Sequence, residues 1–181
     1  MEVLDLKQNY FDLFNLSLSF EIDRNQLLER QQSLQAVYHP DRFVNASEQN
    51  KRLSVQQASW INEAYRTLEN PVRRARYMLE ISGLEMNDES ETTSDTDFLM
   101  EQISYREEME DLSAGSSSLE CCDKLIEKLN GRAEEISQEF VTKFRSGDLN
   151  SARLVNRKMQ FIQRIQDQVT DLQFELEDKL S

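Results

Sequence analysis

The sequence predicts an all-helical protein, and three observations support this prediction. Glycine and proline are scarce, with 4 and 2 residues among 181, as expected for long helices joined by few turns. Apolar residues recur at spacings of three and four, whereas no stretch alternates with the period of two that strands show. A chain of this length forms one domain or two small ones and can bury a hydrophobic core.

The first half of the chain contains clear helix boundaries. A short helix is predicted over "NYFDLFNL", with Tyr10, Phe11, Leu13 and Phe14 as its apolar residues. The next helix begins after Asp23, an N-cap residue with Gln26 three positions later, as in a capping box. It ends near Tyr38, because Pro40 disfavours helical geometry in the residue before it.

Two further helices complete this half. Ser47 can cap the first, whose apolar stripe consists of Ala58, Ile61, Tyr65 and Leu68. Asn70 and Pro71 then form a second start signal, a cap followed by proline at the first helical position. The helix that they open ends at Gly83.

The second half predicts a helical bundle. Residues 85–96 are acidic and polar without an apolar period, and are predicted to be a linker. Helical patterns follow over about 97–112, 119–146 and 149–180. The residues expected to face inward in the last two are Leu125, Leu129, Ile136, Phe140 and Phe144, then Ile162, Ile165, Val169, Leu172 and Leu176. This spacing favours an antiparallel three-helix bundle, because only the last helix sustains the heptads of the rival coiled coil.

Charge and hydropathy exclude several functions. The net charge is −13, and residues 81–181 hold 23 acidic against 11 basic residues. Without a basic stripe the chain is a poor candidate for binding nucleic acid, because phosphate contacts need lysine and arginine. The N-terminus lacks the features of a signal peptide, and no stretch is apolar enough to span a membrane. We therefore expect a protein of a reducing compartment, the cytoplasm.

The two cysteines, Cys121 and Cys122, are neighbours within a helical pattern. Adjacent helical positions point about 100° apart, so we expect no bridge between them. No further cysteine or histidine completes a metal site. One thiol in the core and one at its edge is the expected arrangement, and no metal or other cofactor is predicted.

His39 is the only histidine, and Pro40 and Asp41 follow it. A catalytic base needs a nucleophile or a second acid and groups that hold developing charge, and the surrounding loop offers none. A single histidine cannot form a histidine-rich metal site either. A histidine bonded to the end of its helix remains a simple alternative.

The helix over 97–112 carries apolar residues on two faces. Phe98, Tyr105, Met109 and Leu112 share one face. The opposite side holds Leu99, Met100, Ile103, Glu107 and Asp111. A bundle helix needs one apolar stripe. The second stripe is an exposed partner site, a face that packs on the first half, or a set of scattered surface apolar residues, which are common.

A helix ending in "YHPDRF", followed by "INEAYRTL" and "NPVRRARY", resembles the J domain of Hsp70 co-chaperones. In that family the His-Pro-Asp tripeptide lies between two antiparallel helices, contacts the Hsp70 and stimulates its ATP hydrolysis. The resemblance implies that His39, Pro40 and Asp41 contact an Hsp70, with Arg30 and Arg42 as supporting charges. Ala36 and Val37 stand where many J domains are basic, which implies weaker electrostatic steering and a dedicated Hsp70.

The stretch "DTDFLMEQISYREEMEDL" and the later "RKMQFIQRI" resemble the HscB family, J-type co-chaperones of iron–sulfur cluster assembly. The resemblance implies an L-shaped molecule with a J domain over 1–84, a linker over 85–96 and a three-helix bundle over 97–181. It implies two partners, a specialised Hsp70 of the HscA type and the cluster scaffold protein IscU, and no enzymatic activity of the chain itself.

The same resemblance implies a set of scaffold-binding residues: Leu99, Met100, Ile103, Glu107, Asp111 and Phe161. Phe161 lies at the edge of its helix's core stripe, so it either reaches outward or packs inward. Ser104 stands where family members have an acid, which removes one possible polar contact. Eukaryotic members often begin with a zinc module, so a chain that starts at the J domain favours a bacterial form.

Two alternatives remain at the level of sequence. The chain could be a general J-domain co-chaperone whose bundle binds unfolded clients. It could also be a purely structural bundle with an incidental His-Pro-Asp. Binding of one folded partner, rather than of many unfolded ones, would distinguish the dedicated co-chaperone.

Overall fold

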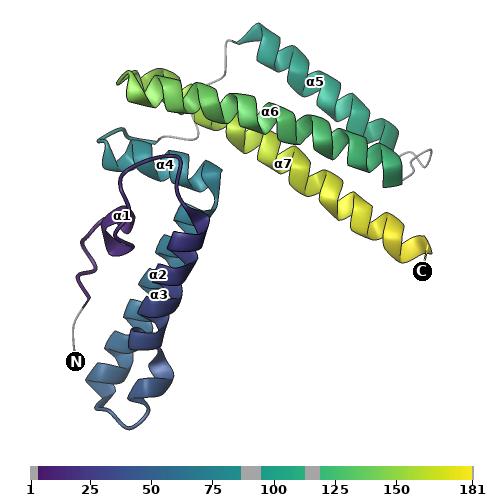
Figure 1. Cartoon of the computed structure of the whole chain (residues 1–181). Helices are drawn as coiled ribbons and strands as arrows, with labels where there is room; N and C mark the ends of the chain where they lie inside the picture. The colour runs from purple at the N-terminus through teal and green to yellow at the C-terminus, as the bar shows by residue number, and fades with distance from the viewer. Residues whose placement is uncertain (1–3, 87–94, 113–118, 181) are drawn as a thin grey trace. The chain divides into compact units, whose positions relative to one another are not determined.

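The computed structural model describes residues 4–86, 95–112 and 119–180, and within these ranges all regular structure is helical (Figure 1). This confirms the predicted fold class. The elements are α1 (Tyr10–Leu13), α2 (Arg24–Tyr38), the 3-10 turn η1 (Pro40–Phe43), α3 (Glu48–Glu69), α4 (Pro71–Ile81), α5 (Thr96–Asp111), α6 (Leu119–Arg145) and α7 (Leu149–Leu180).

The chain divides into two compact units, Met1–Gly83 and Leu84–Ser181. Each unit is described by itself. Most of the segment predicted to be a linker, residues 87–94, lies outside the described residues.

The predicted caps define the helices of the first unit. The Asp23 carboxylate accepts the backbone N–H groups of Asn25 and Gln26, at 2.9 and 3.1 Å. The Asn70 side chain likewise accepts from the second and third residues of α4. These side chains satisfy N–H groups that have no partner within the helix. Local sequence signals therefore set the helix starts, as predicted.

The core of the first unit lies between the antiparallel helices α2 and α3 (Figure 1). Helices α1 and α4 pack against α3 and complete it. Its fully buried large side chains are Phe11, Phe14, Leu27, Ile61, Leu68, Met78 and Leu79. Ile61 and Leu68 belong to the predicted stripe of α3, and the other two members of that stripe are half-buried. A paired hairpin results, and its loop end lies at the opposite end of α3 from α4.

An aromatic cluster holds α1 against α3 and α4. The Tyr10 ring stacks on Tyr77 with centroids 4.4 Å apart, and Trp60 approaches Tyr10 edge-on at 5.1 Å. The Tyr77 hydroxyl also accepts the backbone N–H of Tyr10 at 2.9 Å. Trp60 is the single tryptophan of the chain.

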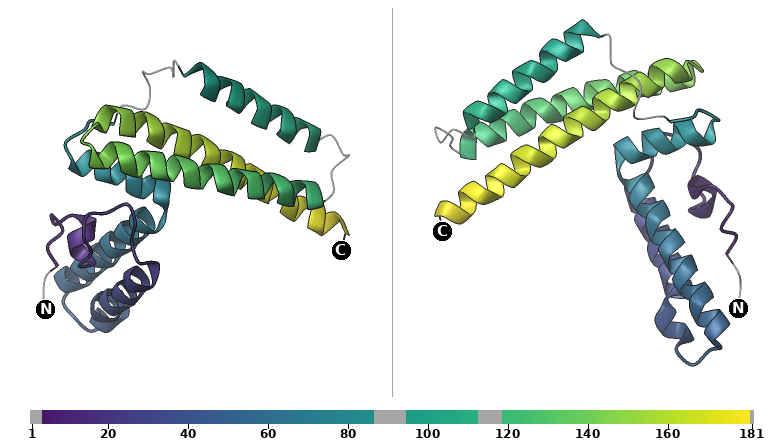
Figure 2. Two further views of the ribbon diagram at one scale, coloured as in Figure 1. Left: turned by 45° about the horizontal axis from the view of Figure 1, so that its top comes forward. Right: turned by 180° about the vertical axis from the view of Figure 1, so that it is seen from behind.

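The second unit is built on a long antiparallel pair, α6 and α7 (Figure 2). Its buried residues follow the predicted stripes and include Leu125, Leu129, Ile136, Phe140, Ile162, Ile165 and Val169. Phe144, Leu172 and Leu176, which were expected inside, are half-buried. Gly147 joins the helices at φ +76°, a conformation that suits glycine at a helix end.

Helix α5 lies along this pair and completes the predicted three-helix bundle (Figure 2). Phe98 and Tyr105 of its predicted inner face are buried, and the other two residues of that face are half-buried. Cys122 is fully buried and Cys121 is exposed, which confirms the expected placement of the two thiols. None of the helices described in the structure combines the length and the apolar composition needed to cross a membrane.

Candidate functional site

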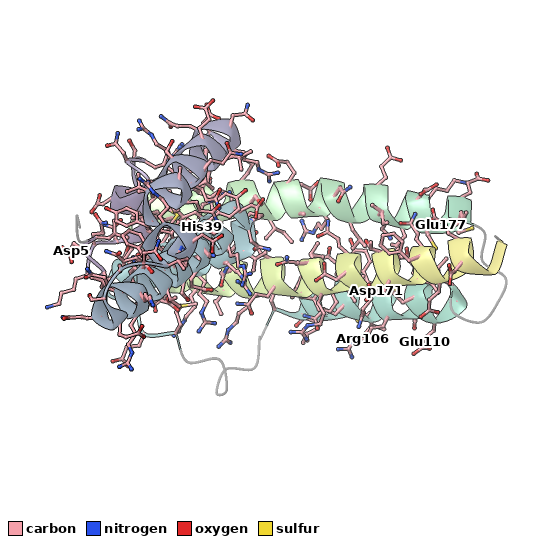
Figure 3. All side chains as sticks on the ribbon, turned by 90° about the horizontal axis from the view of Figure 1, so that it is seen from below. Asp5, His39, Arg106, Glu110, Asp171 and Glu177 are labelled. Carbon is pink, nitrogen blue, oxygen red and sulfur yellow. The ribbon has the colours of Figure 1, made fainter. Side chains whose placement is uncertain are left out.

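The His-Pro-Asp tripeptide lies at the free end of the α2–α3 hairpin. His39 is labelled in Figure 3, where the molecule is seen from below the view of Figure 1. His39 ends α2 with extended backbone (ψ 131°), and Pro40 opens η1. The side chains of His39 and Asp41 are 56% and 87% exposed. The proline thus ends one helix and presents both polar side chains to solvent.

The imidazole of His39 has a defined orientation. Its Nδ1 accepts the backbone N–H of Asp41 at 3.3 Å and lies 3.6 Å from an oxygen of the Asp41 carboxylate. Nδ1 cannot both accept a hydrogen bond from the backbone N–H of Asp41 and donate a proton to the Asp41 carboxylate. With Nδ1 accepting from this backbone donor, the ring N–H lies on Nε2. That N–H is then available to a partner.

Arg42 folds back onto the end of α2. Its Nη1 donates to the carbonyl of Ala36 at 2.6 Å and, at 3.5 Å, to that of Val37. These carbonyls belong to the last turn of α2, where no following helical N–H is present to bond them. The resemblance predicts Arg42 as a supporting charge, which stays a prediction. The sequence analysis missed the contact with α2, because that contact depends on the turn geometry.

Arg30 is exposed on α2, nine residues before His39 and therefore about 13 Å along the helix axis. The tripeptide itself has apolar neighbours, since Val37 and Val44 are 44% and 60% exposed. Of the five residues expected to contact an Hsp70, four lie together at the turn, and Arg30 lies apart along the helix.

The second candidate surface is the outer face of α5, defined by Leu99, Met100, Ile103, Glu107 and Asp111. All five are exposed, and the three apolar residues are 38%, 64% and 49% accessible. Exposed apolar side chains in a row beside carboxylates are typical of a protein-binding surface. The two faces of this helix are separated as the sequence predicted.

Phe161 does not belong to that outer face. Its ring is 9% exposed and packs edge-on against Phe98, with centroids 5.6 Å apart. It also lies 6.5 Å from the ring of Tyr105. Of the two positions left open by the sequence, the structure shows the inward one, beneath α5. Ser104 donates to Glu108 at 3.3 Å and is exposed.

Within the described ranges, no group of three or more histidine, cysteine or acidic side chains could hold a metal ion. The two candidate surfaces differ in the side chains that they expose. One is an exposed polar turn, and the other is an apolar row with acidic neighbours.

A two-helix hairpin with an exposed His-Pro-Asp turn, joined to a helical bundle, defines a co-chaperone of the J-domain class. A co-chaperone HscB homologue of Shewanella halifaxensis is 39% identical over 174 residues, covering 94% of this chain and 99% of that protein. A Shewanella loihica homologue is 40% identical over 161 residues, covering 87% of this chain and 93% of that protein. The chain belongs to the HscB family of co-chaperones.

Solved structures show the same fold. The chaperone HscB from Vibrio cholerae aligns with a TM-score of 0.81 at 34% identity, covering 96% of this chain and 100% of its own. The human co-chaperone HscB aligns with a TM-score of 0.84 at 26% identity, covering 94% of this chain and 84% of its own. Residues 94–170 match the family model described as the HSCB C-terminal oligomerisation domain.

Proposed function

We propose that the chain couples a specialised Hsp70 of the HscA type to an IscU-type scaffold protein in the assembly of iron–sulfur clusters in the cytoplasm. The observation that carries this proposal is the exposed, conformationally fixed His39-Pro40-Asp41 turn in a chain of the HscB family. The first unit stimulates ATP hydrolysis by the Hsp70, and the second holds the scaffold. The chain itself is an adaptor and catalyses no reaction.

The turn suits its proposed role on physical grounds. Pro40 and the Arg42 contact fix the backbone before binding, so little conformational entropy is lost when the partner docks. The exposed Asp41 carboxylate can accept hydrogen bonds from an arginine or lysine of the Hsp70. The remaining N–H groups of Arg42 supply positive charge at the turn, and Arg30 adds a second positive charge further along α2.

The outer face of α5 suits a folded partner. Leu99, Met100 and Ile103 form its apolar part, and Glu107 and Asp111 extend it with negative charge. A small number of buried apolar contacts dominates most protein interfaces, whereas charges at the rim set orientation and specificity. Phe161 contributes by supporting Phe98 and Tyr105 from below.

Holding both partners raises the effective concentration of the scaffold at the Hsp70. ATP hydrolysis then traps the scaffold on the chaperone. This sequence of events requires that the two surfaces act independently, one in residues 1–84 and the other in the bundle over 97–181.

The test is ATP hydrolysis by the HscA-type Hsp70, measured with this protein and the scaffold added separately and together. We expect stimulation by this protein that rises synergistically with the scaffold. His39→Gln should remove the stimulation yet leave scaffold binding intact by calorimetry. Gln32→Ala, an exposed change on α2, is the matched control and should keep both.

Three results would contradict the proposal. Stimulation that is indifferent to the scaffold would point to another client, and stimulation by unrelated unfolded polypeptides would favour a general co-chaperone. Loss of scaffold binding in His39→Gln would contradict the division of roles between the two units.

A further inference from the structure

Helix α5 is attached to α6 and α7 mainly through side chains. Its backbone comes close to theirs at few positions, and long side chains bridge the distance between them. The ion pairs that connect α5 or its cap to α6 and α7 include Asp95–Lys158 at 2.7 Å, Glu101–Arg132 at 2.7 Å and Glu108–Lys128 at 2.6 Å. We refer to these six residues as the clasp.

Arg132 makes the most elaborate contact of the clasp. Its Nε and Nη2 donate to the two carboxylate oxygens of Glu101, at 2.7 and 3.0 Å, and its Nη1 donates to Glu135. Two parallel hydrogen bonds between guanidinium and carboxylate fix both distance and angle. The hydrogen bonds to Glu101 hold the pKa of Arg132 above its usual range.

The two lysines of the clasp also contact the aromatic side chains of α5. Lys128 Nζ lies 5.0 Å from the centroid of the Tyr105 ring, and Lys158 Nζ lies 5.5 Å from that of Phe98. Both distances allow a cation–π attraction. Each lysine therefore holds one carboxylate and one ring of the same helix.

Asp95 links the clasp to the start of α5. Its carboxylate accepts the N–H of Phe98 at 3.0 Å, as an N-cap, and also pairs with Lys158. Lys158 and the backbone N–H lower the pKa of Asp95 below its ordinary value. One carboxylate thus orders the first turn and attaches it to α7.

Apolar contacts contribute to the same attachment, and few residues of α5 make them. Phe98 and Tyr105 are the buried residues of α5, and both pack on Phe161. Partly exposed ion pairs are weakened by salt, whereas buried apolar contacts are affected much less. The position of α5 should consequently depend on ionic strength more than the α6–α7 pair does.

We infer that Lys128, Arg132 and Lys158 are positioning residues for the outer face of α5. They lie on the opposite side of the helix from Leu99, Met100 and Ile103, and act by holding α5 in the geometry that presents this row. Loosening α5 lowers the fraction of molecules that are competent to bind, and the apparent affinity falls by that fraction. The inference rests on the proposed function, since it assigns the scaffold to this row.

Charge reversal of the central pair tests the inference. In the full chain, Arg132→Glu and Glu101→Arg should each speed hydrogen exchange of α5 amides while α6 and α7 exchange as before. Each should also weaken binding of the apo IscU-type scaffold by about fivefold. The double variant should restore both properties, because the pair is reformed with reversed charges. Arg164→Ala, which removes an exposed arginine of α7 outside the clasp and the binding row, is the control for lost charge.

Salt provides a second readout. Raising the ionic strength from about 0.05 to 0.5 M should speed α5 exchange in the wild type and have less effect on Arg132→Glu. If Arg132→Glu disturbs α6 and α7 as well, Arg132→Lys keeps the charge, loses the parallel hydrogen bonds and should show a smaller effect of the same sign.

Two outcomes would overturn the inference. One is unchanged α5 exchange after charge reversal. The other is faster exchange with unchanged scaffold affinity, which would show that the clasp does not position the binding row. Failure of the wild type to bind the scaffold at all would reject the proposed function. The hydrogen-exchange data would still test whether the clasp holds α5 in place.

Discussion

The two candidate surfaces are held in place by different means. The His39-Pro40-Asp41 turn is fixed by its own neighbours in sequence, through the proline, the Asp41 N–H bond to His39 and the Arg42 contact with the end of α2. The outer face of α5 is fixed by residues 20 to 63 positions away, on α6 and α7. A locally fixed turn tolerates substitutions elsewhere in its unit. A face that distant residues hold in place can be displaced by substitutions outside the face itself.

The strongest test of the first surface is Asp41→Asn. The change preserves shape and removes the charge that would pair with the Hsp70, so we expect stimulation of ATP hydrolysis to fall to the basal rate. The side chain is 87% exposed, so the thermal midpoint should not move. A variant that still stimulates fully would show that the carboxylate charge is not needed.

The second surface should respond to combined truncation of Leu99, Met100 and Ile103 to alanine. We expect roughly 1–2 kcal/mol of scaffold binding to be lost for each residue. Circular dichroism should remain native because the three side chains are exposed. Undiminished affinity in calorimetry would place the scaffold site elsewhere.

Phe161→Ala distinguishes support from contact. The ring is buried against Phe98 and Tyr105, so its loss should destabilise the second unit by about 3 kcal/mol and weaken scaffold binding indirectly. Phe174→Ala, on the same helix but 65% exposed, should stay within about 0.5 kcal/mol of the wild type. Denaturant unfolding measures both. Weaker binding by Phe161→Ala with wild-type stability would instead make this ring a direct contact.

Arg42→Ala should have a smaller effect. Loss of the bond to the Ala36 carbonyl should lower stability by about 1 kcal/mol and reduce maximal stimulation more than apparent affinity for the Hsp70. Arg66→Ala removes the same charge from an exposed site at the other end of α3 and serves as the control. A fall in affinity for the Hsp70 alone, with stability unchanged, would indicate that Arg42 contacts the Hsp70 directly.

Acid should produce the smallest effect. The lowered pKa of Asp95 means that its carboxylate stabilises the folded state above an ordinary carboxyl pKa of about 3.9. This stabilisation is lost as the pH falls through the lowered value, and because the pair is partly exposed it amounts to about 1 kcal/mol or less. NMR signals of the α5 amides should report loosening below about pH 4. In Asp95→Asn the acid response should be flatter, and an unchanged response would exclude Asp95 as its source.

Much of the fold could be predicted from the sequence because its signals are local. Asp23 and Asn70 cap the predicted helices, and Pro40 ends α2 where expected. The two faces of α5 were separable because helical geometry alone decides which residues share a side. These features need no knowledge of how the helices pack.

The rest depends on contacts that a sequence pattern does not contain. Phe161 lies on the edge of its stripe, and only the placement of α5 decides that it packs inward. The bond of Arg42 to α2 needs the chain reversal at Pro40 and the rotamer of a long side chain. The clasp pairs residues such as Glu101 and Arg132, and many other acidic and basic pairs in the chain would have matched equally well.

Trp60, packed against Tyr10, gives a fluorescence signal that comes from the first unit only. Tryptophan fluorescence reports the unfolding of the first unit alone, because the second has no tryptophan, whereas the helical circular dichroism signal reports both. Comparing the two transitions in a single melt therefore gives the relative stabilities of the two units without cutting the chain.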